Sequence, residues 1–128
     1  MGNGTSIGRV RGLGSAHEGA HHWLIQRFTA IGNVVLMIWF IASILLMPDM
    51  SYSTVTEWLS GPVSAAAMVL LIISVFWHAR LGLQVLIEDY VHEAGTKFAV
   101  LALLNLAVIA GGVFGIFCVV SLALGGAA

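Results

Sequence analysis

Three apolar segments, each long enough to cross a lipid bilayer, constrain this chain more than any other feature of its sequence. They run over about residues 22–47, 63–87 and 98–124, and each ends at turn-forming or charged residues. A hydrocarbon layer about 30 Å thick needs roughly 20 apolar residues in a helix. Backbone polar groups must be satisfied within that layer, which favours helices. The sequence therefore predicts an all-α integral membrane protein with three transmembrane helices in a bundle.

The composition excludes an ordinary soluble domain. Hydrophobic residues make up 59% of the 128 residues and charged residues only 9%, whereas about a quarter of the residues in a soluble domain are charged. The three spans and their loops use the whole length, so residues 1–128 are predicted to form a single membrane domain. The lone cysteine, Cys118, lies in an apolar stretch, so neither a disulfide nor a cysteine metal site can form within the chain.

The charges in the loops predict the orientation of the spans. Residues 1–20 form a glycine-rich polar arm, and no signal-peptide pattern follows its first arginines, so the arm is expected to stay on the chain. The second loop carries Lys97, whereas the first loop, residues 48–62, contains no lysine or arginine. The arginines that flank the first span are Arg9, Arg11 and Arg27. The positive-inside rule therefore places the N-terminus and the second loop in the cytoplasm, and the C-terminus on the opposite side.

His78 lies within the second span, about ten residues from its predicted cytoplasmic end. At about 1.5 Å per residue, its ring is roughly 15 Å below the interface. There it must face protein, a water cavity or a cofactor. One interpretation is an interhelical hydrogen bond, and the other is ligation of a haem iron by the imidazole. Gly82, four residues later on the same helix face, would leave space for a macrocycle, and Arg80 could meet its carboxylates.

The first span begins with a polar stretch at the same predicted membrane level. It contains Gln26 and Arg27 and a group of histidines, which are His17, His21 and His22. This stretch is interpreted either as an interfacial anchor belt with Trp23 or as a set of partners for an anionic group. A metal site of its own is disfavoured because Glu18 is the one acidic residue nearby and no zinc motif is present.

Asp89 and Tyr90 lie at the cytoplasmic end of the second span. They could be a solvated carboxylate and an aromatic-belt residue. Alternatively, the phenol could donate a hydrogen bond to a quinone carbonyl while the carboxylate passes a proton from the cytoplasm. Both interpretations fit the position.

Small and polar residues in the third span indicate close helix packing. Gly111 and Gly115 lie four residues apart on one helix face, and Asn105 could bridge two helices with its amide. We expect this span to act as scaffold.

Two motifs together resemble a known family. The run HARLGLQVLIEDYVH, in which Asp89 follows His78 by eleven residues, and the run AHHWLIQRFTA before the first span closely resemble the D-type hydrophobic membrane-anchor subunit of succinate dehydrogenase, respiratory complex II. The resemblance covers essentially the whole chain. It implies a bundle shared with a partner anchor subunit, in the inner membrane of a bacterium.

The resemblance also implies roles for individual residues. His78 would be one axial ligand of haem b, and a second, C-type cytochrome b anchor subunit would supply the other. His21 and Arg27 would lie near the haem propionates. Asp89 and Tyr90 would belong to the quinone site, with the phenol as the direct donor. A propionate role for Arg80 is our inference from its position and not part of the resemblance.

The function expected from this resemblance is electron transfer in a complex. FAD would be bound by a flavoprotein subunit, and iron-sulfur clusters by a subunit that delivers electrons to a quinone, expected to be ubiquinone, with menaquinone as the alternative. This anchor would have no activity alone, and its other contacts would be with membrane lipid. The alternative is a haem-free structural anchor of a fumarate reductase-type or other respiratory complex. A transporter is disfavoured because no acidic residue lies within a span, and no nucleic-acid patch is present.

Overall fold

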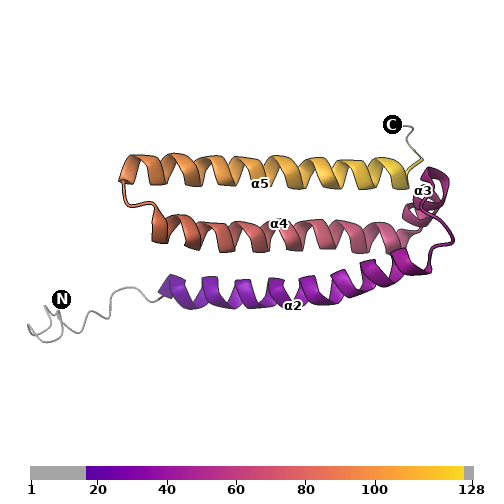
Figure 1. The fold of residues 1–128 in the computed structure, drawn as a ribbon, viewed down its shortest axis with the longest axis horizontal. Coiled ribbons are helices and arrows are strands. Elements are labelled where there is room, and N and C mark those ends of the chain that lie inside the picture. The colour runs from indigo at the N-terminus through magenta and orange to yellow at the C-terminus, as the bar shows by residue number, and fades with distance from the viewer. Residues whose placement is uncertain (1–16, 126–128) are drawn as a thin grey trace, which may run out of the picture.

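The computed structural model describes residues 17–125, which form four helices and no strand. Three of these helices are long and apolar enough to cross a membrane, and they lie side by side along the molecule (Figure 1). The helices are α2 (His17–Leu46), α3 (Tyr52–Ser60), α4 (Pro62–Tyr90) and α5 (Ala94–Ala123). The predicted all-α fold with three spans is confirmed. Two of the arginines used to predict the orientation, Arg9 and Arg11, lie outside the described residues.

The helix ends follow local sequence signals. Pro62 occupies the first turn of α4, where its missing N–H costs no hydrogen bond. Glu93 caps the N-terminus of α5 by accepting a hydrogen bond of 3.0 Å from the backbone N–H of Thr96. Only residues 91–93 separate α4 from α5. Such a short connection makes the two helices antiparallel neighbours.

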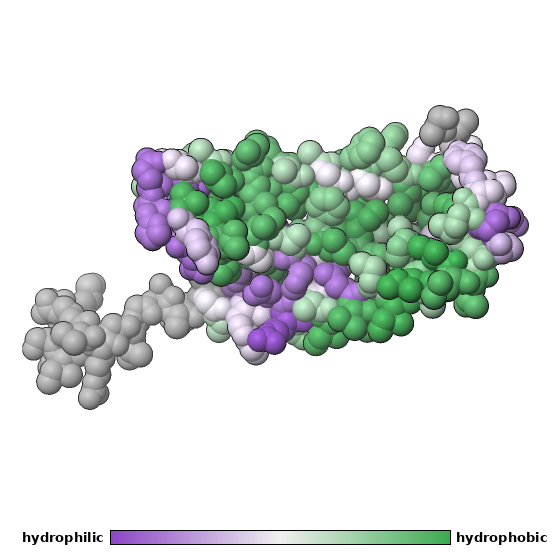
Figure 2. Space-filling model, in the orientation of Figure 1, coloured by the Kyte–Doolittle hydropathy of each residue, from purple (hydrophilic) through white to green (hydrophobic). Residues whose placement is uncertain are grey.

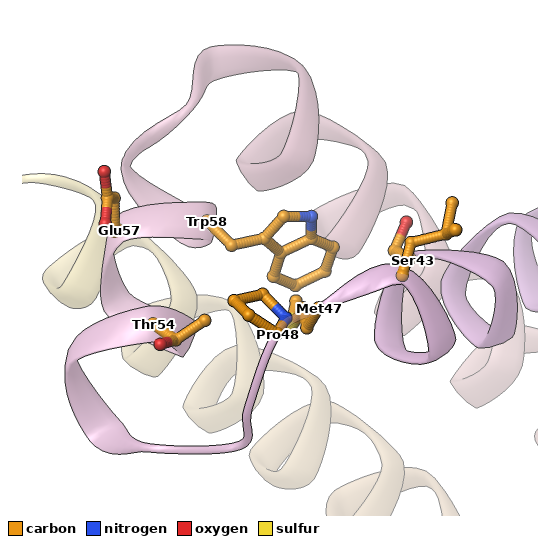
Figure 3. A pocket seen from close by; sticks show the side chains of 7 residues that line it. Ser43, Met47, Pro48, Thr54, Glu57 and Trp58 are labelled. Atoms are coloured by element: carbon orange, nitrogen blue, oxygen red, sulfur yellow. The ribbon is translucent and has the colours of Figure 1, made fainter.

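The loop predicted between the first two spans contains an additional short helix, α3. Ser51 caps this helix by accepting a hydrogen bond from the Thr54 N–H. The Trp58 ring of α3 stacks on Trp39 of α2 with the ring centroids 5.5 Å apart. Trp58 also lines an open cleft of about 490 Å³ (Figure 3). The sequence analysis did not identify α3 because nine residues with several Ser and Thr give little helical signal.

The centre of the bundle is α4, which packs against α2 on one side and α5 on the other (Figure 1). Few side chains in the described part of the chain are buried; the hydrophobic ones are Leu59, Leu71, Leu81, Ile87 and Val119. The long helices present a mainly apolar surface, with one hydrophilic group partway along, between α2 and α4 (Figure 2). The apolar surface suits contact with lipid or with other membrane helices, so the chain is a multi-pass membrane protein.

Glycines bring α5 close to α4. The sequence analysis predicted close helix packing at Gly111 and Gly115 without naming the partner helix. A Cβ atom at Gly111 would lie 2.7 Å from Cε1 of Phe76, and one at Gly115 would lie 3.4 Å from Ile72. Both glycines therefore face α4. At the neighbouring Gly112 an added Cβ would meet the Phe76 ring only at 3.9 Å, an ordinary contact distance.

We expect Gly111→Ala to destabilise the α4–α5 packing by about 1–3 kcal/mol, because the added methyl displaces Phe76. The matched Gly112→Ala variant should be close to neutral. Unfolding of the purified protein in mixed detergent measures the difference. Equal stability of the two variants would contradict this account of the helix contact.

A carboxylate orders the segment before α3. Asp49 Oδ1 accepts hydrogen bonds from the Ser51 hydroxyl, from the Ser51 N–H at 2.9 Å and from the Thr54 hydroxyl at 2.7 Å. These bonds, the one from the Ser51 side chain most of all, lower the pKa of Asp49 from 3.8 to about 2. Because the folded pKa lies below the unfolded one, the stabilisation is fully present above about pH 4. It is lost as the pH falls through about 2.

We therefore expect the Asp49 carboxyl to titrate with a midpoint of about 2, measured by NMR of the carboxyl carbon in detergent micelles. Ser51→Ala should raise that midpoint toward the ordinary value, because it removes the hydroxyl donor. The resonance is assigned by its disappearance in Asp49→Asn. An unchanged midpoint in Ser51→Ala would show that the hydroxyl does not lower this pKa.

Candidate functional site

His78 projects from α4 toward α2. Its Nδ1 atom lies 3.0 Å from the hydroxyl oxygen of Thr29, a hydrogen-bond distance between two helices at a depth where polar contacts are scarce. The ring is half-buried. In residues 17–125 the two buried side-chain nitrogen or oxygen atoms without a hydrogen bond are His22 Nε2 and Asn33 Oδ1. His78 Nε2 also has no hydrogen-bond partner in this part of the chain, but it is not among these buried atoms. It therefore reaches the surface of the described bundle.

Thr29 is itself held by both helices. Its hydroxyl oxygen lies 2.9 Å from the carbonyl oxygen of Ile25 and 3.0 Å from that of Gln26, both in its own helix. Its backbone carbonyl accepts a hydrogen bond of 3.3 Å from the Ser74 hydroxyl on α4. Ser74 and His78 are four residues apart, on one face of α4. Two hydrogen bonds therefore connect that face to a single residue of α2.

The helix face beyond His78 is open. A Cβ atom at Gly82 would have one neighbour within 4 Å, the side-chain nitrogen of Gln26 at 4.0 Å. In the part of the chain that the structure describes, no three His, Cys, Asp or Glu side chains gather as a metal site. A haem iron that takes its second ligand from another subunit would need only one imidazole from this chain, and His78 offers Nε2 beside open space. These residues fit one half of a haem site.

Arg80 points away from His78. Two positions along a helix rotate a side chain by about 200°, and the Arg80 Nε donates a hydrogen bond of 2.5 Å to the Asn105 side-chain oxygen on α5. The two side chains border an otherwise apolar cleft of about 520 Å³ between α4 and α5. The predicted bridging role of Asn105 is thus observed, and its partner is the guanidinium. The structure does not bring Arg80 together with the Thr29–His78 pair.

The start of α2 carries the other predicted residues. Arg27 lies with its guanidinium carbon 5.1 Å from the centre of the Trp23 ring, a cation–π arrangement. Both side chains and His21 are exposed on the surface of the chain, whereas His22 is half-buried. Thr29 lies two positions beyond Arg27 and contacts His78, so this part of α2 runs beside the face of α4 that carries His78. The step of two residues from Thr29 turns Arg27 by about 200°, so its guanidinium lies on a different face of α2 from the Thr29–His78 contact.

The end of α4 forms a second, separate region. Tyr90 is 77% exposed, and Asp89 beside it is also exposed. Among the described residues neither the Tyr90 phenol nor the Asp89 carboxylate has a hydrogen-bond partner. The nearby Lys97 side chain donates its hydrogen bond to the Glu88 carbonyl, at 3.1 Å. Tyr90 lies twelve residues beyond His78, about 18 Å along the helix. The two polar groups are therefore free to contact another molecule at the membrane surface.

Thr29 and Ser74 were not among the residues predicted to form the site. Their signal is the spacing of polar residues within apolar spans. Gln26 and Thr29 lie three residues apart on α2, and Ser74 and His78 lie four apart on α4. Each spacing places the pair on one helix face. The sequence could not show that these two faces meet.

Comparisons with known proteins agree with these observations. The model of the succinate dehydrogenase/fumarate reductase transmembrane subunit family matches residues 1–124. The succinate dehydrogenase hydrophobic membrane anchor subunit of Rickettsia bellii is 34% identical over 87 residues, which cover 68% of this chain and 70% of the relative. The succinate dehydrogenase membrane anchor subunit of Reclinomonas americana is 35% identical over 96 residues, covering 72% and 79%. The corresponding subunit of Coxiella burnetii is 24% identical over 95 residues, covering 74% and 83%.

Proposed function

We propose a specific role for this chain, which belongs to the succinate dehydrogenase/fumarate reductase transmembrane subunit family and is a membrane anchor subunit of succinate dehydrogenase. In this proposal it is the D-type anchor, it ligates haem b and it lines the quinone-reduction site. The observation that carries the proposal is the environment of His78. Its Nδ1 is hydrogen-bonded to Thr29 while Nε2 is free beside open space. An imidazole held in this way within a membrane span is suited to binding iron.

In this proposal Nε2 of His78 would hold the haem iron from this chain, and the C-type cytochrome b anchor subunit would supply the other ligand. Bound haem supplies a one-electron carrier between the helices. His21 and Arg27 would supply hydrogen-bond donors, and Arg27 a positive charge, to the carboxylates of a propionate. Arg80 remains a predicted propionate partner, but its bond to Asn105 on the α5 side does not favour that role.

The end of α4 would hold the quinone. Reduction of a quinone takes two electrons, which the iron-sulfur subunit would deliver from the flavoprotein subunit, and two protons. The Tyr90 hydroxyl is suited to donate a hydrogen bond to a quinone carbonyl. Asp89 is suited to accept protons from water and pass them toward the reaction. We take ubiquinone as the acceptor.

The proposed orientation puts this end of the bundle in the cytoplasm of a bacterium, with the anchor in its inner membrane. Within the described residues, Arg27 and Lys97 lie near the start of α2 and of α5, at the same end of the bundle as Tyr90 (Figure 1). The opposite end carries Asp49 and Glu57 and no lysine or arginine between α2 and α4. This asymmetry is the one expected from the positive-inside rule.

The test is to express the chain together with the subunits of its complex, purify it through an affinity tag on this chain and record reduced-minus-oxidised visible spectra. We expect the flavoprotein, the iron-sulfur subunit and the second anchor to copurify and a b-type haem band to appear. Copurification without a haem band would leave the anchor role and overturn the haem proposal. Absence of the soluble subunits would contradict the proposed place of this chain in the complex.

A haem-free structural anchor is the second candidate function. The Thr29–His78 bond favours it to the extent that an interhelical hydrogen bond satisfies one ring nitrogen without any cofactor. The same spectra distinguish the two candidates.

A further inference from the structure

We propose that Thr29 is a positioning residue for His78: it accepts the Nδ1 proton, fixes the tautomer of the ring and so makes Nε2 the nitrogen that binds iron. The inference rests on the proposed haem site and names a residue that the motifs of this chain did not assign. Its basis is the set of hydrogen bonds around one hydroxyl group.

The direction of the Thr29–His78 bond follows from counting protons. A hydroxyl has one proton to donate and two lone pairs that accept. The Thr29 oxygen lies 2.9 Å and 3.0 Å from two backbone carbonyls of its own helix, Ile25 and Gln26, and a carbonyl can only accept. The hydroxyl proton is therefore directed to these carbonyls. With the hydroxyl proton on a carbonyl, the remaining contact, 3.0 Å to Nδ1, is satisfied by an N–H that donates to the hydroxyl oxygen.

The tautomer of the ring follows from this direction. A neutral imidazole carries one proton, so a proton on Nδ1 leaves a lone pair on Nε2. Metal-bound histidines commonly donate their other N–H to a carbonyl, carboxylate or water, which sets the ring orientation. Here a neutral hydroxyl has that position. Acidic side chains on the described spans lie at the cytoplasmic end of α4, at Glu88 and Asp89, ten and eleven residues beyond His78.

The position of the hydroxyl is fixed by a second bond between the same helices. Ser74, one turn before His78, donates to the Thr29 carbonyl at 3.3 Å. The close approach is possible because Gly32 faces Ser74, where an added Cβ would lie 3.4 Å from the serine hydroxyl oxygen. α4 therefore contacts both the side chain and the backbone of Thr29. This pair of bonds sets the register of α2 against α4, and with it the direction of Nε2.

The opposite arrangement makes a distinct prediction. If the Thr29 hydroxyl donated to Nδ1, the ring proton would lie on Nε2, and this nitrogen could not bind iron without losing it. Removing the hydroxyl would then free the ring and would not weaken the haem site. The two arrangements can be separated by replacing the acceptor while keeping the size of the side chain.

The experiment compares Thr29→Val, Thr29→Ala and Thr29→Ser in the purified complex. Valine keeps the shape of threonine, and alanine is the smaller, helix-favouring change for the case in which valine disturbs assembly. In both we expect an upward shift of the haem b midpoint potential and lower haem content per complex. The shift arises because an imidazole that no longer donates its N–H is a weaker electron donor and stabilises the oxidised iron less. Thr29→Ser should keep the potential and haem content of the unmutated complex.

Redox titration of the haem band gives the potential, and pyridine extraction gives the haem content, so neither readout depends on enzyme activity. A potential and haem content unchanged in both Thr29→Val and Thr29→Ala would overturn the inference. So would a serine variant that behaves like the valine variant. Absence of the haem band from the unmutated complex would instead refute the proposed haem function itself, which keeps the two failures distinct.

Discussion

Replacing His78 by alanine should remove haem b from the complex. The variant loses the nitrogen that we assign to the iron, and even changes to the hydrogen-bond partners of a metal ligand typically cost about 10–100-fold in metal affinity. We therefore expect the haem content per complex to fall by more than about tenfold. The interhelical bond to Thr29 is lost as well, but such bonds contribute on average about 0.6 kcal/mol in a membrane protein, so the bundle should still assemble.

The measurement is the reduced-minus-oxidised spectrum of complexes normalised to the flavin content. His92→Ala is the matched control, because His92 is an exposed histidine just beyond the end of α4. Among the described residues its ring has one hydrogen bond, with the Tyr90 carbonyl oxygen at 3.2 Å. It should retain the full haem band. A His78→Ala complex with an unaltered band would show that His78 is not the ligand.

Replacing Tyr90 by phenylalanine should slow quinone reduction by about 10²-fold or more, the usual cost of removing one hydrogen-bond donor to an oxygen on which negative charge develops. The change removes one oxygen atom and leaves the ring, which is 77% exposed at the end of α4, so the fold should be unaffected. Transfer of electrons from succinate to a soluble artificial acceptor should continue, because that reaction would bypass the proposed quinone site. The rate of succinate oxidation with each acceptor is the measurement.

The chain provides a matched control for this variant. Tyr52, the other tyrosine, lies on α3 at the opposite end of the bundle and is 67% exposed. Tyr52→Phe should leave both rates unchanged. Equal quinone reduction by the Tyr90→Phe and Tyr52→Phe complexes would remove the phenol from the proposed quinone site and leave Asp89 to be tested by Asp89→Asn.

Much of the fold could be predicted from the sequence because the bilayer restricts the possible structures. The number of spans, their approximate limits and a close helix contact at Gly111 and Gly115 follow from span length and small-residue spacing. The partner in that contact, α4, was not predicted. α4 extends beyond its predicted span at both ends, from Pro62 to Tyr90. α2 and α5 begin four or five residues earlier than predicted and end within one residue of the predicted limit. The apolar stretch marks only the part of a helix within the hydrocarbon layer, and polar turns can continue the same helix.

Less of the site could be predicted. His78 was identified by its depth in the membrane. A polar ring in hydrocarbon needs a partner whichever direction the ring faces. The identity of that partner, Thr29, was not available from the sequence. Arg80 was assigned to the same group as His78 because the two are close along the chain, whereas the helix turns Arg80 toward Asn105. Proximity in sequence was a poor guide to the face that each residue occupies.

The sequence by itself determined that this is a three-span membrane protein, that its one deep histidine requires a partner, and that Asp89 and Tyr90 lie at a membrane surface. Those conclusions depend on lengths and depths, which a helix fixes at a constant rise per residue. Only the tertiary structure decided which helix faces meet, placing Thr29 and Ser74 at the α2–α4 contact and Arg80 on the α5 side. The physical reason is that these spans are apolar on nearly every face, so their sequence has no periodic pattern that shows which face packs against another helix. Side-chain packing and a few hydrogen bonds determine that face.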